Sequence, residues 1–264
     1  MEKRTQKQLA IGGIFILILA GISYGFVDYF LITEATCFDG IKNGKEEGSD
    51  CGTLACGKTC EPEIKSVEVL SSQVFKVADG DYDFVAKVSN PNAFYGASRI
   101  EYVIEPFSQS GFTYILPGQT KYVVLASVRR TGDVVDPRLI IKNVQWVKLD
   151  SPDGGVSFTV QSKNFITSQD KSELEAILYN NSNYDFDKVD VSVVLFDGQD
   201  NIVGVNRTDI RTFVSKSERG LNVSWPLDFS GIVVRQEVEA HTNLFENSNF
   251  IKSYGNQERF QKFY

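Results

Sequence analysis

One stretch of alternating apolar and polar residues occurs twice in the chain. The segment DYDFVAKVSNPNAFYGASRIEYVIEPF at residues 81–107 aligns with KSELEAILYNNSNYDFDKVDVSVVLFD at residues 171–197. The aligned pairs keep a constant offset of 90, and they are Phe84 and Leu174, Ala86 and Ala176, Val88 and Leu178, and Asn90 and Asn180. Apolar residues at every second position are typical of half-buried β-strands. The chain is therefore predicted to build one β architecture twice.

The sequence around these segments also supports a duplicated β architecture. After a one-residue slip Ile100 matches Val189 and Phe107 matches Phe196, and residues 115–125 parallel residues 213–223. Strands are expected at 67–77, 82–90, 99–107, 122–128 and 138–149, between turn sequences such as Leu116-Pro117-Gly118-Gln119. Linker sequence lies at 150–155, and a hairpin at 197–201 lengthens the second copy. Short strands at this rhythm predict a mainly β fold with two tandem sandwiches, residues 63–150 and 151–247.

The N-terminal region carries a candidate membrane anchor. Residues 8–27 contain no charged side chain, and at about 1.5 Å per residue such a helix spans the roughly 30 Å hydrocarbon core of a bilayer. Lys3, Arg4 and Lys7 precede it, whereas Asp28 and Glu34 follow it. The positive-inside rule then places residues 1–7 in the cytoplasm, a transmembrane signal anchor at 8–30, and the rest of the chain outside the cell.

Two other interpretations of this segment stay open. A cleaved signal peptide normally has a shorter apolar region and an A-x-A-like cleavage site, and neither is clear here. The segment would also suit the core helix of a soluble domain.

All four cysteines lie in a glycine-rich neck at residues 37–60, and they are Cys37, Cys51, Cys56 and Cys60. Outside the cytoplasm an even number of cysteines predicts disulfides, here two, although the sequence cannot choose among three pairings. A zinc site is the alternative, but the spacing lacks paired C-x2-C motifs. Oxygen ligands between the glycines suggest a calcium loop as a further alternative to a solvated turn, and these ligands are Asp39, Asn43, Glu46, Glu47 and Asp50.

Three resemblances to known families can be given on these residues. The neck pattern C-x-D-G-I-x-N-G-x-E-x-G-x-D-C-G resembles a Cys-rich motif of bacterial cell-surface proteins, which implies a surface location. Residues 185–225 resemble the FxLYD domain at Phe186, Leu195, Phe196 and Asp197, with Phe in place of the family's Tyr. The first copy resembles the late-embryogenesis-abundant type 2 sandwich. The last two resemblances imply immunoglobulin-like or fibronectin-type-III-like β-sandwiches and no catalytic activity.

Composition and motifs argue against several function classes. A formal net charge of −7 is unfavourable for a nucleic-acid-binding protein. A single histidine, His241, excludes a multi-histidine metal centre, and no G-x-S-x-G or phosphate-loop motif is present. We expect His241 to be a surface or half-buried strand residue. Asp185, Asp187 and Asp190 are expected in an inter-strand loop, as strand-end caps or as a calcium site.

The C-terminal tail, residues 248–264, is rich in aromatic side chains that are costly to leave in water. Either the tail packs back on the second sandwich or it docks on a partner, and the candidate residues are Phe250, Tyr254, Phe260, Phe263 and Tyr264. The sequence as a whole predicts a non-catalytic, membrane-anchored extracytoplasmic module. It would bind or adhere to a protein partner at the cell surface or join an envelope assembly. A structural spacer is the alternative, and an enzyme or ligand carrier with a hidden site is a third.

Overall fold

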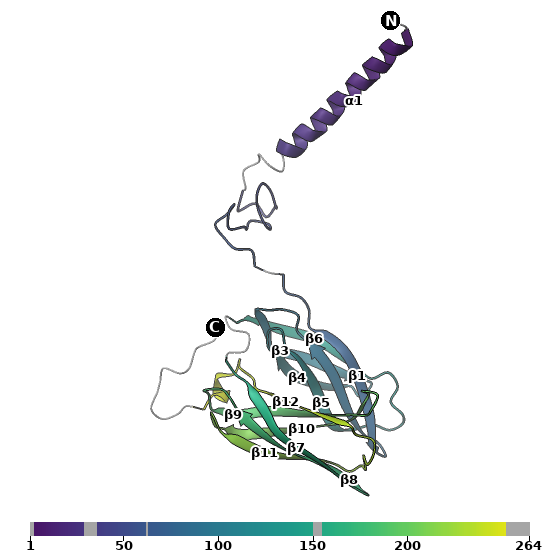
Figure 1. Ribbon diagram of the computed structural model, residues 1–264, viewed down its shortest axis with the longest axis vertical. Coiled ribbons are helices and arrows are strands. Elements are labelled where there is room, and N and C mark those ends of the chain that lie inside the picture. The colour runs from purple at the N-terminus through teal and green to yellow at the C-terminus, as the bar shows by residue number, and fades with distance from the viewer. Residues whose placement is uncertain (1–2, 29–35, 62, 150–154, 252–264) are drawn as a thin grey trace. The chain divides into compact units, whose positions relative to one another are not determined.

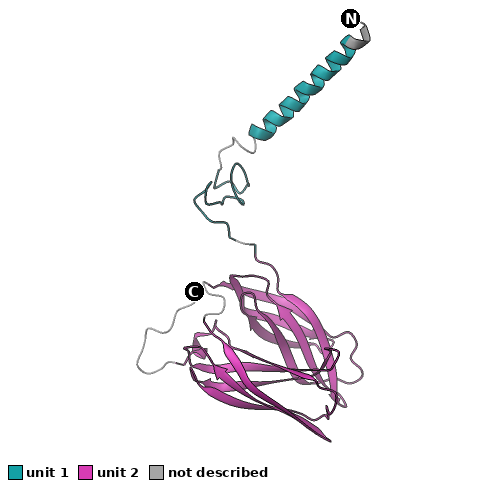
Figure 2. Ribbon diagram, viewed as in Figure 1, with its two compact units in different colours: residues 1–63 teal, residues 64–264 magenta. Residues whose placement is uncertain are grey.

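The computed structural model describes residues 3–28, 36–61, 63–149 and 155–251. The chain divides into two compact units, residues 1–63 and residues 64–264 (Figure 2). Each unit has its own internal contacts.

The first unit contains one long apolar helix followed by the neck. Helix α1 spans Lys3–Val27, and its segment Gln6–Val27 has a mean hydropathy of 2.2 with no side chain buried inside the protein. Its 22 residues fit a signal anchor or a single membrane span. The neck is built of turns and isolated bridges, Gly48 with Cys51 and Gly52 with Lys58.

Two disulfides hold the neck together, Cys37–Cys56 and Cys51–Cys60. The predicted number of disulfides is confirmed, and the structure selects one of the three pairings. Disulfides of this kind form in oxidising compartments, which indicates an extracytoplasmic location for the neck.

The second unit is entirely β apart from a short 3-10 helix, η2 (Asn247–Asn249), within the described residues. Its twelve strands are β1 (Glu68–Ala78), β2 (Asp81–Ser89), β3 (Tyr95–Glu105), β4 (Gln109–Ile115), β5 (Thr120–Arg129), β6 (Arg138–Lys148), β7 (Phe158–Ser168), β8 (Lys171–Asn180), β9 (Phe186–Phe196), β10 (Ile202–Phe213), β11 (Glu218–Trp225) and β12 (Arg235–His241). The predicted strands of the first copy are all present within a few residues of their expected bounds. Strand β4 was not predicted, because Ser110 and Gly111 interrupt its apolar alternation.

The strand order occurs twice (Figure 1). Residues 64–149, the first half, form the sheets β1-β2-β5 and β4-β3-β6. Residues 155–251, the second half, form β11-β8-β7 and β10-β9-β12. Every strand of the first half thus has a counterpart six strands later, and all pairs in these sheets are antiparallel.

Each half has its own hydrophobic core. In the first half, Phe84, Ala86 and Val88 of β2 pack with Ile100 of β3. In the second half the aligned residues do the same, namely Leu174, Ala176, Leu178 and Val189. Period-2 alternation directs these side chains to one face of each strand, as the sequence repeat predicts.

A duplicated asparagine locks the loops at one end of each half. The buried Asn90 amide donates to the carbonyls of Tyr95 and Leu116, and its Oδ1 accepts from the backbone of Asn92. Asn180 makes the corresponding contacts in the second half, donating to carbonyls and accepting from a backbone N–H, with Tyr184, Phe213, Val214 and Ser182 as partners. Each asparagine thus satisfies backbone groups that two turns would otherwise leave unpaired.

A third apolar cluster joins the two halves. It consists of Val85, Tyr122 and Val124 from the sheet β1-β2-β5 and Val194, Phe196 and Val205 from the sheet β10-β9-β12. Val85 and Val124 lie on the opposite face of their strands from the first core. We call this contact the joint.

Candidate functional site

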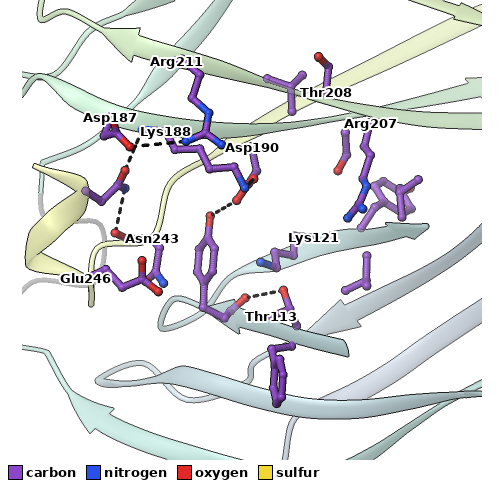
Figure 3. A pocket seen from close by; sticks show the side chains of 18 of the residues that line it. Thr113, Lys121, Asp187, Lys188, Asp190, Arg207, Thr208, Arg211, Asn243 and Glu246 are labelled. Atoms are coloured by element: carbon purple, nitrogen blue, oxygen red, sulfur yellow. Dashed lines mark hydrogen bonds and ion pairs between the residues drawn. The ribbon is translucent and has the colours of Figure 1, made fainter. Parts of the chain in front are cut away.

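A polar cleft of about 460 Å³ lies beside the joint, between the two halves (Figure 3). Strands β3, β4 and β5 line it from the first half. Strands β9 and β10 and the segment 243–249 line it from the second half. A volume of this size lies within the range of small-molecule sites.

The alternation of β9 explains why the joint and the cleft lie side by side. Val189, Val191, Val193 and Leu195 turn into the core of the second half. The residues between them point to the other face, where Lys188, Asp190 and Ser192 line the cleft and Val194 and Phe196 enter the joint. One face of β9 therefore changes from charged to apolar along its length.

Four cations and three carboxylates line the cleft, Lys121, Lys188, Arg207, Arg211, Asp187, Asp190 and Glu246. Two of the carboxylates have direct partners, since Lys188 Nζ lies 2.6 Å from Asp190 and Arg211 Nη1 lies 3.5 Å from Asp187. Arg211 also pairs with Asp209. These ion pairs are partly exposed. They do not include the ammonium of Lys121 or the guanidinium of Arg207.

Lys121 is the most unusual of these groups. The residue is only 5% exposed, at the start of β5, and its Nζ lies 3.7 Å from the centroid of the Tyr114 ring. In the part of the chain that the structure describes, no carboxylate forms a contact ion pair with this ammonium. Figure 3 shows Lys121 on the first-half side of the cleft, opposite Asp190 of the second half.

Burial lowers the pKa of Lys121 to about 8, and the carboxylates of Asp190 and Glu239 act in the opposite direction. Burial also raises the pKa of Tyr114 well above its usual value, and the nearby Asp190 adds to this effect. The Tyr114 hydroxyl donates a long hydrogen bond, 3.5 Å, to Asp190 Oδ2. Tyr114 therefore remains a neutral donor while Lys121 carries a costly charge.

Arg207 brings a second cation from the opposite half. It lies on β10, on the exposed face of that strand, and has no ion pair among the described residues. Burial raises the pKa of the Tyr102 hydroxyl on β3, and the nearby positive charge of Arg207 lowers it by a smaller amount. The cleft thus has one unpaired cation from each half.

His241 lies near the cleft, at the end of β12, and is half-buried on a strand as predicted. Its Nδ1 is 2.8 Å from Gln119 Nε2 of the first half, and its Nε2 is 3.3 Å from Glu239 Oε2. Glu239 Oε2 in turn accepts from the backbone N–H of Tyr122. The histidine is used in polar contacts between the halves, with Gln119 and Glu239 as its side-chain partners in the described part of the chain.

The acidic residues predicted for an inter-strand loop are placed differently. Asp187 and Asp190 lie within β9, where they pair with Arg211 and Lys188. Asp185 precedes the strand and accepts from the backbone of Ser215. The expectation of a loop was wrong for Asp187 and Asp190. Phe186 packs into the core of the second half, and β9 begins at this residue, so both aspartates lie within the strand.

The aromatic tail is described only as far as residue 251. Phe250 packs on the rings of Tyr184 and Phe186, with centroids 5.6 and 5.4 Å away. Asn249 fixes this segment by accepting from Lys188 N at 2.9 Å. Phe250 is thus engaged in internal packing, and the other predicted tail residues, Tyr254, Phe260, Phe263 and Tyr264, lie outside the described residues.

The calcium ligands predicted in the neck serve mainly as acceptors for backbone amides. Asp50 accepts from Asp39 N and Gly40 N, and Glu46 accepts from Asn43 N and Asp50 N. Asp39 accepts from the Asn43 amide, and Glu47 from the Thr53 hydroxyl.

Within residues 36–61, the one group of metal-ligating side chains close enough to share an ion is Cys37, Glu46 and Cys56. Its cysteines form a disulfide with each other. Calcium binding by the neck stays a prediction.

Sequence reasoning missed the joint and the cleft, although a signal was present. The runs Phe84-Val85-Ala86, Tyr122-Val123-Val124-Leu125 and Val193-Val194-Leu195-Phe196 are continuously apolar. Such runs indicate strands that are buried on both faces. Nothing in the sequence marked Lys121 or Arg207, since charged residues at strand positions are normally solvated.

The chain matches no family model and no curated protein. Among solved structures, a member of glycosyl hydrolase family 2 from Bacteroides cellulosilyticus is similar over 61% of this chain, at 11% sequence identity and a TM-score of 0.20. The match covers 26% of that protein, about a quarter of its length. A similarity this weak carries no argument about fold or function.

Proposed function

We propose that the protein is a membrane-anchored, extracytoplasmic binding module without catalytic activity, and that the cleft is its ligand site. Helix α1 would anchor it with residues 1–7 in the cytoplasm, and the two β halves would present the cleft outside the cell. Each half would be an immunoglobulin-like or fibronectin-type-III-like sandwich. The repeated strand order and the separate cores of the halves support that assignment.

The observation that carries the proposal is the Lys121 side chain, which is only 5% exposed and whose ammonium faces the polar cleft without an ion pair among the described residues. Burying a charge without a partner opposes folding, so groups of this kind gather at functional sites. A protein that only holds other components apart would gain stability from an apolar residue at this position. The neck disulfides support the location, because they form outside the reducing cytoplasm.

A structural spacer remains the second candidate, and the joint favours it. The apolar cluster of Val85, Val124, Val194 and Val205 couples the halves, as a stiff spacer would require. A spacer, however, has no use for the cleft.

Photo-crosslinking in living cells separates the two functions. A photoreactive phenylalanine analogue replaces Phe112, which is 58% exposed on the rim of the cleft, and in a matched control it replaces Ile166, which is 46% exposed on β7. The full chain is then irradiated in its own membrane and its mass is compared with an unirradiated sample. A binding module gives a defined adduct from position 112 and none from position 166. No adduct at 112, or equal adducts at both positions, would favour the spacer.

A further inference from the structure

We infer that the cleft beside the joint binds the anionic group of a small ligand, a carboxylate or a phosphate, between Lys121 of the first half and Arg207 of the second. The inference rests on the proposed function, because it names the ligand class of the proposed site. Its first premise is the burial of Lys121. The side chain is only 5% exposed, and its ammonium faces the cleft. A lysine this deeply buried normally has a carboxylate in contact, and among the described residues the ammonium contacts only the face of the Tyr114 ring.

The second premise is the pairing of the other charges. Asp190 is held by Lys188 and Asp187 by Arg211, so the two carboxylates of β9 are already compensated. Glu246, the residue before η2, is the one lining carboxylate without a direct ion pair in the described part of the chain. Its charge is felt by Tyr114, but it does not contact Lys121. An incoming anion would therefore find two cations without ion pairs, with Glu246 as the lining carboxylate that competes for them and with Asp190 and Glu239 close enough to act on the charge of Lys121.

The third premise is the kind of surface that surrounds the cations. Tyr102 and Tyr114 contribute hydroxyl groups, and Thr113, Ser192 and Thr208 add neutral polar side chains. A planar guanidinium binds carboxylate or phosphate oxygens in pairs, while an ammonium acts as a point charge. The volume of about 460 Å³ admits a ligand the size of a monosaccharide or a small organic acid.

The repeat supplies a matched control. Lys121 pairs with Val88 in the first half, and Arg219 pairs with Leu178 in the second half. Since Val88 and Leu178 are aligned, Arg219 occupies the position of Lys121 in the other copy. Arg219 is exposed, donates to the carbonyl of Thr212 and does not line the cleft.

Titration calorimetry of the full chain in detergent micelles tests the inference at constant ionic strength. The probes are inorganic phosphate and D-glucuronate, with D-glucose as the neutral control. Wild type is expected to bind at least one of the two anions and not glucose, and which one identifies the anionic group. Lys121→Met and Arg207→Gln should each weaken that binding about tenfold or more, and Arg219→Met should leave it unchanged. Arg207 is exposed, so its variant stays informative even if Lys121→Met fails to fold.

A pH series adds a readout specific to the ammonium. The titratable groups around Lys121 are Tyr114 on β4, Asp190 on β9, Glu239 on β12 and Glu246 before η2. Burial lowers the pKa of Lys121 to about 8, so its ammonium loses its charge between pH 7 and 9.5, whereas burial raises the pKa of Tyr114 well above its usual value. The affinity for the anion that binds should therefore fall about tenfold per pH unit above pH 8 in wild type and stay flat in Lys121→Met.

Three results would overturn the inference. The first is no heat with either anion, and the second is a flat pH profile in wild type. The third is equal affinity in wild type and both cleft variants, which would indicate an adventitious ion only. If one of these is found while position 112 still gives a crosslinked adduct, the binding function stands and only the anionic ligand is wrong. If position 112 gives no adduct either, the proposed function fails as well.

Discussion

At the scale of single residues, Lys121 is placed where a charged side chain opposes folding. Replacing it with methionine keeps the unbranched stem and removes the charge. A decrease in pKa from 10.5 to about 8 corresponds to about 3 kcal/mol, so Lys121→Met should be more stable than wild type by about that amount at pH 7. Urea unfolding of both proteins checks this.

The pH dependence of that difference has a defined sign. Between the folded pKa of about 8 and the unfolded value of 10.5, the unfolded chain holds one more proton at Lys121 than the folded protein. Wild-type stability therefore rises with pH across this window relative to Lys121→Met, and the advantage of the variant vanishes near pH 10.5. A difference that stays constant from pH 7 to 10 would contradict the buried-charge account.

In contrast to Lys121, the buried asparagine at the end of each half stabilises the fold. Asn180→Ala leaves the carbonyls of Tyr184, Phe213 and Val214 without their donor in a buried site. We expect a loss of about 3 kcal/mol or more, because each unpaired buried group costs about 1–3 kcal/mol. Asn181→Ala is the control, since among the described residues the side-chain amide of Asn181 has one acceptor, Thr159 Oγ1 near the surface. Chemical denaturation with a similar loss in both variants would refute the role of Asn180.

At the scale of elements, the joint decides whether the halves unfold together. Val194→Asp places a carboxylate in the apolar cluster and leaves the core side chains of both halves in place. We expect the heat-capacity trace of the second unit to change from one transition to two. Ile177→Asp is the matched control, since Ile177 is 39% exposed on β8 and does not enter the joint. A single transition in the Val194 variant, at any temperature, would mean that the joint does not couple the halves.

The neck disulfides are expected to act locally. Closing loops of 9 and 19 residues stabilises a chain by about 3 kcal/mol each in the loop-entropy account. Replacing Cys51 and Cys60 by serine should make the neck sensitive to protease and leave the melting temperature of residues 64–264 unchanged. Limited proteolysis combined with calorimetry measures both effects, and a large decrease in that melting temperature would show that the two units depend on each other.

The strands could be predicted from the sequence better than the contacts between them. Strand alternation and the offset of 90 predicted β2, β3 and β8 and the face that each buries, because side-chain direction follows from the period of a strand. For β9 they predicted the later part of the strand, whereas Asp187 and Asp190 near its start were expected in a loop. The pairing of β9 with β10 and β12, and the contact of Val194 with the first half, depend on residues distant in the chain. Lys121 could not be identified as a site residue, because its unusual feature is burial between halves, which no local pattern records.

At the scale of the whole molecule, the account requires residues 1–7 inside and the β unit outside the cell. Protease added to intact spheroplasts should remove the β unit and leave an N-terminal tag protected, because α1 would cross the membrane once. In the same preparation, alkylation without reductant should modify none of the four cysteines. A protected β unit would refute the topology.

We propose above all that a ligand supplies the counter-ion that Lys121 lacks. Native mass spectrometry of the full chain, purified from its own membranes in ammonium bicarbonate and released from micelles, measures this directly. The account predicts one bound acidic molecule per chain in wild type and in Arg219→Met, and none in Lys121→Met. A wild-type protein with no bound mass, or the same bound mass in all three proteins, would contradict it.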